Sequence, residues 1–296
     1  MVVVINKTLR IITLFWLLLA APAVMAEDVL QTGVSVLKSA VKNKDAFLDI
    51  NEPREIELGA GMSAQLLGAA GLVDNPELQK YVNRIGMWLV FQTERTALPW
   101  RFAVLDEDSI NAFAAPGGYI FISRGLFMLF RSESELAGVL AHEIGHVLAL
   151  HHLEDIQEKA RNSFMKDVGG MVIDDVAGGN WNQLVKQLVN SGIDVWESGL
   201  NREDEFQADE LGVVIAARAG YDPYGLLGVL DTLGRLDHGQ GNIYEQMHAT
   251  HPPASERLQR LDARMTGAME DYATEPAASP GLYEFQAQLE QQQAGR

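Results

Sequence analysis

The segment His142-Glu143-Ile144-Gly145-His146 constrains this chain more than any other feature, because it places three ionisable side chains inside an apolar stretch. Ser132 and Glu135 form a capping-box pair, and apolar residues then recur at helical spacing to about His152. Residues four apart share one face of a helix, so both imidazoles can point at one ion, with Glu143 beside them. The alternative is a pair of solvated or capped histidines, but burying these groups without an ion would be costly.

The sequence contains no cysteine, so any transition metal must be held by imidazoles and carboxylates, a set that suits zinc. A catalytic zinc usually takes three protein ligands, so a third must come from elsewhere in the chain. Glu205 is the candidate, because it opens a helical pattern in which Asp209 falls one turn later on the same face. Asp209 could accept a hydrogen bond from a ligand histidine. The alternative is that both acids belong to a solvated charged face. We expect one Zn²⁺ per chain.

Charge and the N-terminal segment restrict the location and the partners. The formal net charge of −17 argues against nucleic acid as a partner. Lys7 and Arg10 precede an apolar run over 11–20, and Val24-Met25-Ala26 resembles a signal-peptidase site, so residues 1–26 are predicted to be a signal peptide. An uncleaved membrane anchor is the alternative. No other stretch looks transmembrane, so we expect a protein of the periplasm without a stable transmembrane anchor.

The chain divides into four predicted regions: the signal peptide at 1–26, a lead-in over 27–52, one domain over 53–268, and a flexible acidic and Gln-rich tail over 269–296. The predicted fold class is α+β, mostly helical, with a small antiparallel sheet beside the helix that carries His142. The predicted helices are Glu55–Ala70, Asn75–Gln92, Ser132–His152, Glu203–Ala219, Asp222–Leu233 and Ala254–Met265. The predicted strands are Trp100–Leu105, Ala112–Ala114 and Tyr119–Ser123.

A series of short motifs then points to a family. In chain order they are Glu57-Leu58-Gly59, Tyr81 to Gly86, Leu98-Pro99-Trp100, Asn111 to Ala114, Pro116 to Tyr119, Arg124-Gly125-Leu126, His142 to His146, Ala208-Asp209, Gly220 to Pro223 and Thr250-His251-Pro252. Together they resemble the zinc metallopeptidase family that includes HtpX, the CAAX prenyl protease and the periplasmic β-barrel assembly-enhancing protease. The resemblance covers roughly Pro53 to Met265. It implies a zincin-type fold of the gluzincin kind, closest to short periplasmic members without tetratricopeptide repeats.

The resemblance also implies roles for individual residues. His142, His146 and Glu205 match the family's zinc ligands. Glu143 matches its general base, and Asp209 matches a carboxylate that supports a ligand histidine.

Substrate contacts are implied for the predicted sheet. Tyr119, Ile120 and Phe121 resemble the edge of the active-site sheet, where an extended peptide could pair by its backbone. Asn111 is compatible with a contact to the substrate backbone, and equally with a turn residue after Ser109.

Two later residues keep several interpretations. His251 could be a regulatory fourth ligand that holds the enzyme inactive, a donor to the transition state, or a simple loop residue. Arg257 could stabilise an oxyanion in catalysis or pair with an acid such as Asp209.

These observations predict a zinc-dependent endopeptidase of the cell envelope that degrades misfolded or misassembled outer-membrane proteins and can contact the outer-membrane assembly machinery. The alternative is a chaperone-like protein that binds envelope proteins and whose proteolysis is latent. A structural or zinc-storage site is a third, weaker interpretation.

Overall fold

The computed structural model describes residues 50–167, 185–186, 188–190, 192, 199–236, 251, 253–267, 269–273 and 279–294. The predicted signal peptide, nearly all of the predicted lead-in and residues 237–250 lie outside these residues. The named elements are α2 Glu52–Ala69, α3 Pro76–Val90, β1 Arg101–Leu105, β2 Ala112–Ala115, β3 Tyr119–Ser123, α4 Arg124–Phe127, α5 Glu133–Leu148, α6 His151–Asp167, α9 Arg202–Arg218, α10 Gly225–Leu236, α12 Ala254–Met265, a 3-10 turn Glu270–Tyr272 and α13 Pro280–Ala294.

The sheet has three strands in the order β1-β3-β2, and it is mixed. β3 pairs with β2 in an antiparallel hairpin, and it pairs with β1 in parallel, with Arg101 opposite Tyr119. The three strands were predicted correctly, but the prediction of an antiparallel sheet was wrong. Alternating hydrophobicity places residues on one face or the other, but it does not set the order or the direction of neighbouring strands.

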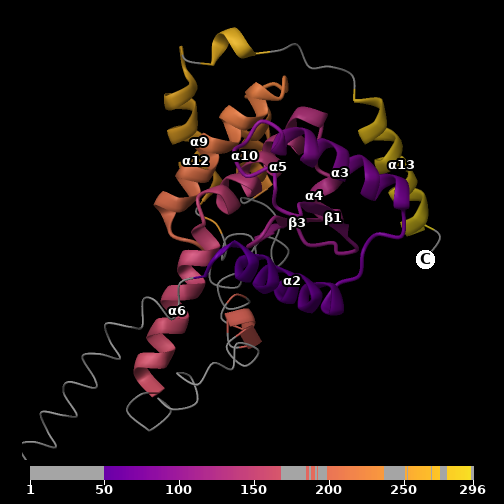
Figure 1. The fold of residues 1–296 in the computed structure, drawn as a ribbon. Coiled ribbons are helices and arrows are strands. Elements are labelled where there is room, and N and C mark those ends of the chain that lie inside the picture. Colours follow the sequence, from indigo (N-terminus) through magenta and orange to yellow (C-terminus); the bar gives the residue numbers. More distant parts are fainter. Residues whose placement is uncertain are drawn as a thin grey trace, which may run out of the picture. The chain divides into compact units, whose positions relative to one another are not determined.

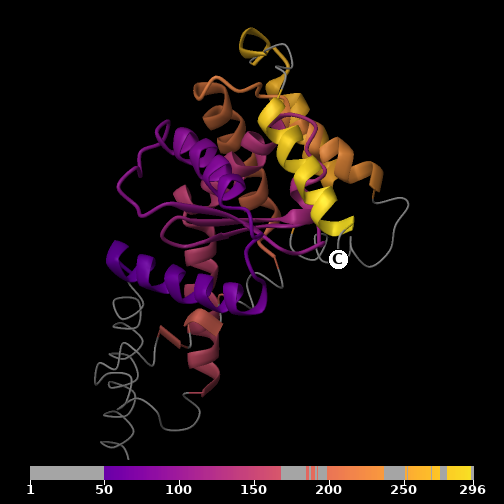
Figure 2. The same cartoon turned by 90° about the vertical axis from the view of Figure 1, so that its right-hand side faces the viewer.

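Helices cover both faces of the sheet. Figure 1 shows α2 on one side, and α3 with α5 on the other; Figure 2 shows the same layers edge-on. Ile120 and Ile122 of β3 face the main core with α3 and α5, whereas Phe121 packs with Leu105 in a smaller cluster on the opposite face. Every second residue of β3 therefore contributes to the same layer, as a strand with two covered faces requires.

The turn between β2 and β3 is tied to α2. Gly117 and Gly118 have φ angles of 75° and 93°, which glycine adopts readily. The Gly117 N–H donates to Glu55 Oε1 at 2.9 Å, and Arg95 pairs with the same buried carboxylate, Nη2 to Oε2, at 2.6 Å. The Pro116-Gly117-Gly118 turn therefore reverses the direction of the chain and also donates a hydrogen bond to the buried carboxylate of Glu55.

The long helix predicted to run to about His152 is interrupted. α5 ends at Leu148, Leu150 has a φ of 63°, and α6 begins at His151. A leucine in the left-handed region is unusual, because its Cβ crowds the backbone there. The break separates α5 from α6.

The C-terminal stretch was predicted to be a flexible tail, and for residues 280–294 this was wrong. These residues form α13, whose Leu282 and Leu289 are buried in the main core. The side-chain amide of Gln286 donates to the carbonyls of Phe127 and Phe130 at 3.1 and 2.8 Å, beyond the C-terminal end of α4. The helix therefore closes a part of the core that would otherwise be open to solvent (Figure 2).

Among the described residues, no helix combines the length and the apolar character needed to cross a bilayer.

Candidate metal centre

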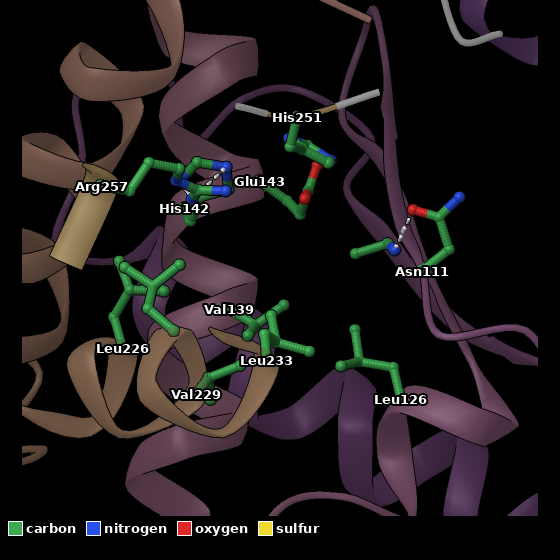
Figure 3. Close-up of a pocket in the computed structure, with 12 residues that line it drawn as sticks. Asn111, Leu126, Val139, His142, Glu143, Leu226, Val229, Leu233, His251 and Arg257 are labelled. Carbon is green, nitrogen blue, oxygen red and sulfur yellow. Dashed lines mark hydrogen bonds between the residues drawn. The ribbon is translucent and has the colours of Figure 1, made fainter. Parts of the chain in front are cut away.

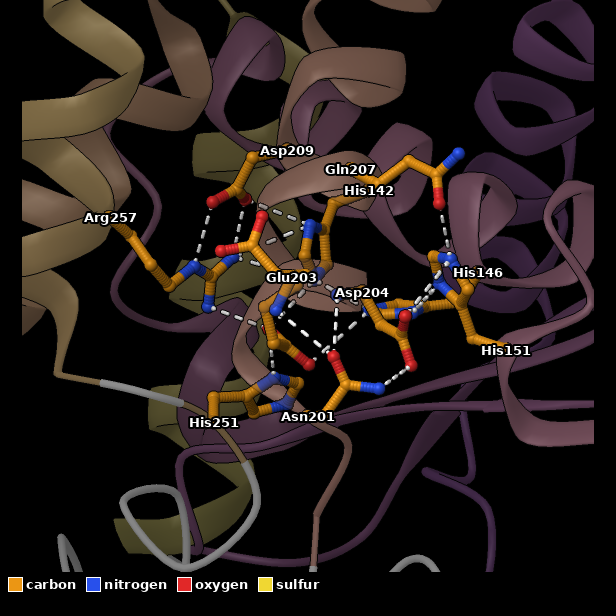
Figure 4. A network of polar contacts seen from close by, with 11 residues as sticks. His142, His146, His151, Asn201, Glu203, Asp204, Gln207, Asp209, His251 and Arg257 are labelled. Atoms are coloured by element: carbon orange, nitrogen blue, oxygen red, sulfur yellow. Dashed lines mark hydrogen bonds and ion pairs between the residues drawn. The ribbon is translucent and has the colours of Figure 1, made fainter. Parts of the chain in front are cut away.

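Helix α5 carries His142, Glu143 and His146 into the interior, where they are 3%, 2% and 1% exposed. The Ser132 hydroxyl accepts from the Glu135 N–H at 3.2 Å, so the predicted N-cap starts the helix. The two histidines project from the same face, and their Nε2 atoms lie 3.1 Å apart. The helical spacing read from the sequence therefore brings both imidazoles to one point (Figure 4).

Helix α9 supplies the carboxylates of the site. Asn201 caps this helix by accepting from two backbone N–H groups, and Glu205 follows in its first turn, where a negative charge is favoured. α9 crosses α5 at close range: a Cβ on Gly212 would lie only 2.9 Å from the backbone nitrogen of His142. This close crossing puts the buried side chains of Glu205 and Asp209 against the histidines.

Asp209 orients His142. Its Oδ1 lies 2.9 Å from His142 Nδ1, and because a carboxylate only accepts, Nδ1 is the donor. Nε2 of His142 is then left without a proton and faces His146. Arg257 binds the same carboxylate through Nε at 2.9 Å and Nη2 at 2.6 Å. Pairing with Asp209 was one of the two interpretations of Arg257 from the sequence. Burial raises the pKa of Asp209, but the Arg257 charge outweighs it and holds the pKa well below its usual value.

The donor set fits zinc. His146 Nε2 lies 3.6 Å from Glu205 Oε1, and His142 Nε2 lies 3.7 Å from Glu205 Oε2. Tetrahedral zinc, with bonds of about 2.0–2.2 Å to nitrogen and oxygen, keeps its ligand atoms roughly 3.3 Å apart. Glu205 Oε1 is buried and has no hydrogen-bond partner, an arrangement that would cost free energy unless a cation binds there.

His251 joins this cluster from a distant part of the chain. Its Nδ1 lies 2.7 Å from Glu205 Oε2, and the ligand atoms of His142, Glu205 and His251 all lie within 4.8 Å of one another. Burial lowers the pKa of His251, but the charge and hydrogen bond of Glu205 raise it above the usual value on balance. His251 therefore lies within the cluster, where the interpretations as a fourth ligand and as a donor both place it.

Glu143 faces a pocket beside the cluster (Figure 3). The pocket is bounded by polar groups of His142, His251 and Arg257, and by apolar side chains that include Val139, Leu226, Val229, Leu230 and Leu233. Burial raises the pKa of Glu143 above that of an ordinary glutamate, and the nearby rings of His142 and His251 offset part of this effect. A carboxylate with a raised pKa is well suited to accept and return a proton near neutral pH.

Comparison with known proteins identifies the family. The sequence profile of peptidase family M48 matches residues 74–265, more than half of the chain. The chain belongs to peptidase family M48. Its relatives include proteins named as metalloendopeptidases, so it is a metallopeptidase by family, and a divalent metal is implied.

Individual M48 relatives match at moderate identity. The β-barrel assembly-enhancing protease of Escherichia coli K12 is 29% identical over 242 residues, which cover 78% of this chain and 49% of the relative. A putative β-barrel assembly-enhancing protease of Vibrio cholerae is 30% identical over 171 residues, or 57% and 35% of the two chains. The mitochondrial metalloendopeptidase OMA1 of Arabidopsis thaliana is 25% identical over 230 residues, or 77% and 42%. The chain spans about half the length of the curated relatives that it matches.

The sheet beside this M48 site differs from the prediction in one way that affects substrate binding. Tyr119, Ile120 and Phe121 lie in β3, which is the central strand and not the edge, so its backbone already pairs on both sides. Among the described strands, β2 lies on the other side of β3 from β1 and packs on α5. Asn111 precedes that strand, is 1% exposed and lines the pocket.

The polar atoms of the Asn111 side chain have different environments. Its Oδ1 accepts from the Ala112 N–H at 2.9 Å, whereas its buried Nδ2 has no hydrogen-bond partner.

Two histidines near the site were not recognised from the sequence. The sequence pattern assigned no role to His151 or His152, but both are buried, and burial lowers the pKa of His152 to about 3. His151 contacts the proposed metal centre directly, because its Nδ1 lies 3.0 Å from Nδ1 of His146. On an unbroken helix, His146 and His151 would point in different directions. The helical pattern of the sequence therefore did not predict this contact.

Proposed function

We propose that this chain is a zinc-dependent endopeptidase in which His142, His146 and Glu205 bind the metal and Glu143 is the general base. One observation carries the proposal: two imidazole nitrogens and an unpartnered carboxylate oxygen converge in the interior, with Glu143 beside them. With a glutamate, Glu205, as its third ligand, the site would be of the gluzincin kind. We assign the peptidase domain to residues 53–268, within which the family match lies.

Zinc, when bound, supplies a Lewis acid that polarises a peptide carbonyl and makes water more acidic. The protein supplies the proton transfers. Glu143 is buried and lines the pocket, so it can take a proton from the attacking water and return it to the amine of the leaving peptide. Asp209 holds the proton on Nδ1 of His142, which keeps Nε2 of that ring available as a ligand.

The substrate is proposed to lie in the pocket beside Glu143 as an extended peptide. Asn111 supports this placement, because its buried Nδ2 needs an acceptor and a peptide carbonyl provides one. The apolar wall formed by α10 suits a hydrophobic side chain next to the scissile bond. Unfolded proteins expose both extended backbone and apolar side chains, which favours them as substrates.

His251 is proposed to hold the enzyme latent. Its hydrogen bond to Glu205 places the ring at the cluster and beside the pocket that a substrate must enter. Release of residue 251 from Glu205 would free the carboxylate and open the pocket. Under the other interpretation, the same ring donates to the transition state, and its removal lowers activity.

Location and natural substrates are proposed from two sources. The N-terminal segment resembles a signal peptide, and several relatives are named for enhancing β-barrel assembly. We therefore propose a periplasmic enzyme that removes misassembled outer-membrane proteins and works near their assembly machinery.

A protease assay on an unfolded protein such as casein tests the proposal. Glu143→Gln should retain zinc but lose cleavage, whereas undiminished turnover would refute the assignment of the base. His251→Ala should cleave faster than the wild type if the residue imposes latency, and more slowly if it stabilises the transition state. A wild type and a His251→Ala variant that are both inactive with zinc bound would refute the peptidase function.

A further inference from the structure

Behind the proposed ligand His146, a hydrogen-bonded chain leads away from the metal cluster. Nδ1 of His146 lies 3.0 Å from Nδ1 of His151, and Nε2 of His151 lies 2.8 Å from Oε1 of Gln207 on α9 (Figure 4). Both histidines are buried. Asp204 offers a second acceptor, with its Oδ1 3.8 Å from the same Nε2.

The order of donors and acceptors along this chain fixes the protons. The amide oxygen of Gln207 and the carboxylate of Asp204 can only accept, so Nε2 of His151 carries a hydrogen. A neutral His151 then has a bare Nδ1, which accepts. Nδ1 of His146 must therefore donate, and its Nε2 is left without a proton. That bare Nε2 is the atom that faces His142 and Glu205.

The backbone break at Leu150 makes this contact possible. Along a continuous α-helix, a residue five positions later is rotated by about 140° from the first. His146 and His151 would then point in different directions. Leu150, in the left-handed region, lies between the end of α5 and the start of α6. His151, the first residue of α6, can therefore contact His146. A strained non-glycine residue at this position is consistent with a functional constraint.

We propose that His151, held by Gln207, is a positioning residue that keeps the proton on Nδ1 of His146 and so leaves Nε2 free to bind the metal. The inference rests on the proposed function, since it assumes that His146 is a ligand. It gives each ligand histidine its own orienting partner: His142 has Asp209, which pairs with Arg257, and His146 has His151, which bonds to Gln207.

Zinc affinity of the full chain, measured by competition with a chelator, tests the inference. His151→Phe keeps a ring in the space but removes the acceptor. Loss of such a partner typically weakens metal binding about 10- to 100-fold. His151→Asn places an amide oxygen near the original Nδ1 and should recover most of the affinity. Gln207→Leu should weaken binding less than His151→Phe, and Gln207→Glu, which keeps the acceptor, should bind zinc like the wild type.

A second measurement reads the proton directly. In the zinc-loaded protein, the Nδ1–H proton of His146 should be protected from exchange with solvent in the wild type, and it should exchange faster in His151→Phe and Gln207→Leu. If His151→Phe does not fold, Gln207→Leu still gives both measurements. The inference is overturned if wild-type zinc affinity persists in the folded variants, or if the Nδ1–H proton of His146 exchanges at the same rate in the variants as in the wild type. A wild type that binds no zinc would instead refute the proposed function.

Discussion

Substitution of Gly212 by alanine tests whether the close crossing of α5 and α9 sets the geometry of the site. A Cβ at this position would lie 2.9 Å from the backbone nitrogen of His142 and 3.0 Å from its Cα. Both are main-chain atoms of a buried helix, so no side-chain rotation can relieve the contact. The two helices must separate by several tenths of an ångström, and α9 carries Glu205 and Asp209 with it.

The magnitude follows from two opposing effects. Replacing glycine by alanine inside a helix normally stabilises it by up to about 1 kcal/mol, whereas overpacking a core costs about 1–3 kcal/mol. Gly234→Ala in α10 is the matched control, because a Cβ there has nothing within 4 Å. We therefore expect Gly212→Ala to be less stable than Gly234→Ala by about 1–3 kcal/mol in urea unfolding. Helix propensity cancels in this comparison.

Zinc affinity should follow the same order. Separation of the helices moves Glu205 relative to His142, so Gly212→Ala should bind zinc more weakly than the wild type. Gly234→Ala should bind zinc as the wild type does, since α10 contributes no proposed ligand. Equal stability and equal zinc affinity of the two variants would refute the view that the helix crossing determines the position of Glu205.

Three further predictions concern other parts of the molecule. Asp209→Asn should lower the free energy of unfolding by about 3–5 kcal/mol, because the charge of Arg257 stays buried without its partner; a loss below 1 kcal/mol would contradict this. Leu282→Ala should cost about 2–5 kcal/mol, whereas Gln291→Ala on the exposed side of α13 should have little effect; equal midpoints would mean that α13 is not part of the core. Asn111→Leu should lower kcat/KM on a peptide roughly tenfold, since it removes the Nδ2 donor, which has no partner among the described residues. Unchanged kinetics would exclude Asn111 from substrate binding.

The positions of the helices and the arrangement of residues along each one could be predicted from local rules. Ser132 caps α5, the glycine turn Gly117-Gly118 joins β2 to β3, and α12 spans Ala254–Met265 as its pattern indicated. The convergence of His142 and His146 follows from the helical repeat alone. Glu205 and Asp209 could be recognised because they are also one turn apart on a helix.

Features that depend on contacts between distant segments could not be predicted in the same way. The interruption at Leu150 has no glycine or proline to mark it, so the pattern indicated one continuous helix, and the contact between His146 and His151 was missed. The composition of the last 28 residues resembles a flexible tail, yet Leu282 and Leu289 are buried against elements more than 100 residues away. In both cases tertiary packing overrides a local preference.

The charges of the buried cluster explain why a divalent cation suits it better than a monovalent one. Three carboxylates, those of Glu143, Glu205 and Asp209, are almost fully buried, and Arg257 is the one buried guanidinium that contacts them among the described residues. With all three acids ionised and His251 neutral, this group carries an excess of two negative charges. Uncompensated charge is expensive in the interior, so the cluster is stabilised most by a ligand with two positive charges. Arg257 neutralises Asp209. The remaining two charges belong to Glu205, a proposed ligand, and to Glu143, the proposed base. The dication would therefore bind where its charge is needed, next to the group that must accept a proton.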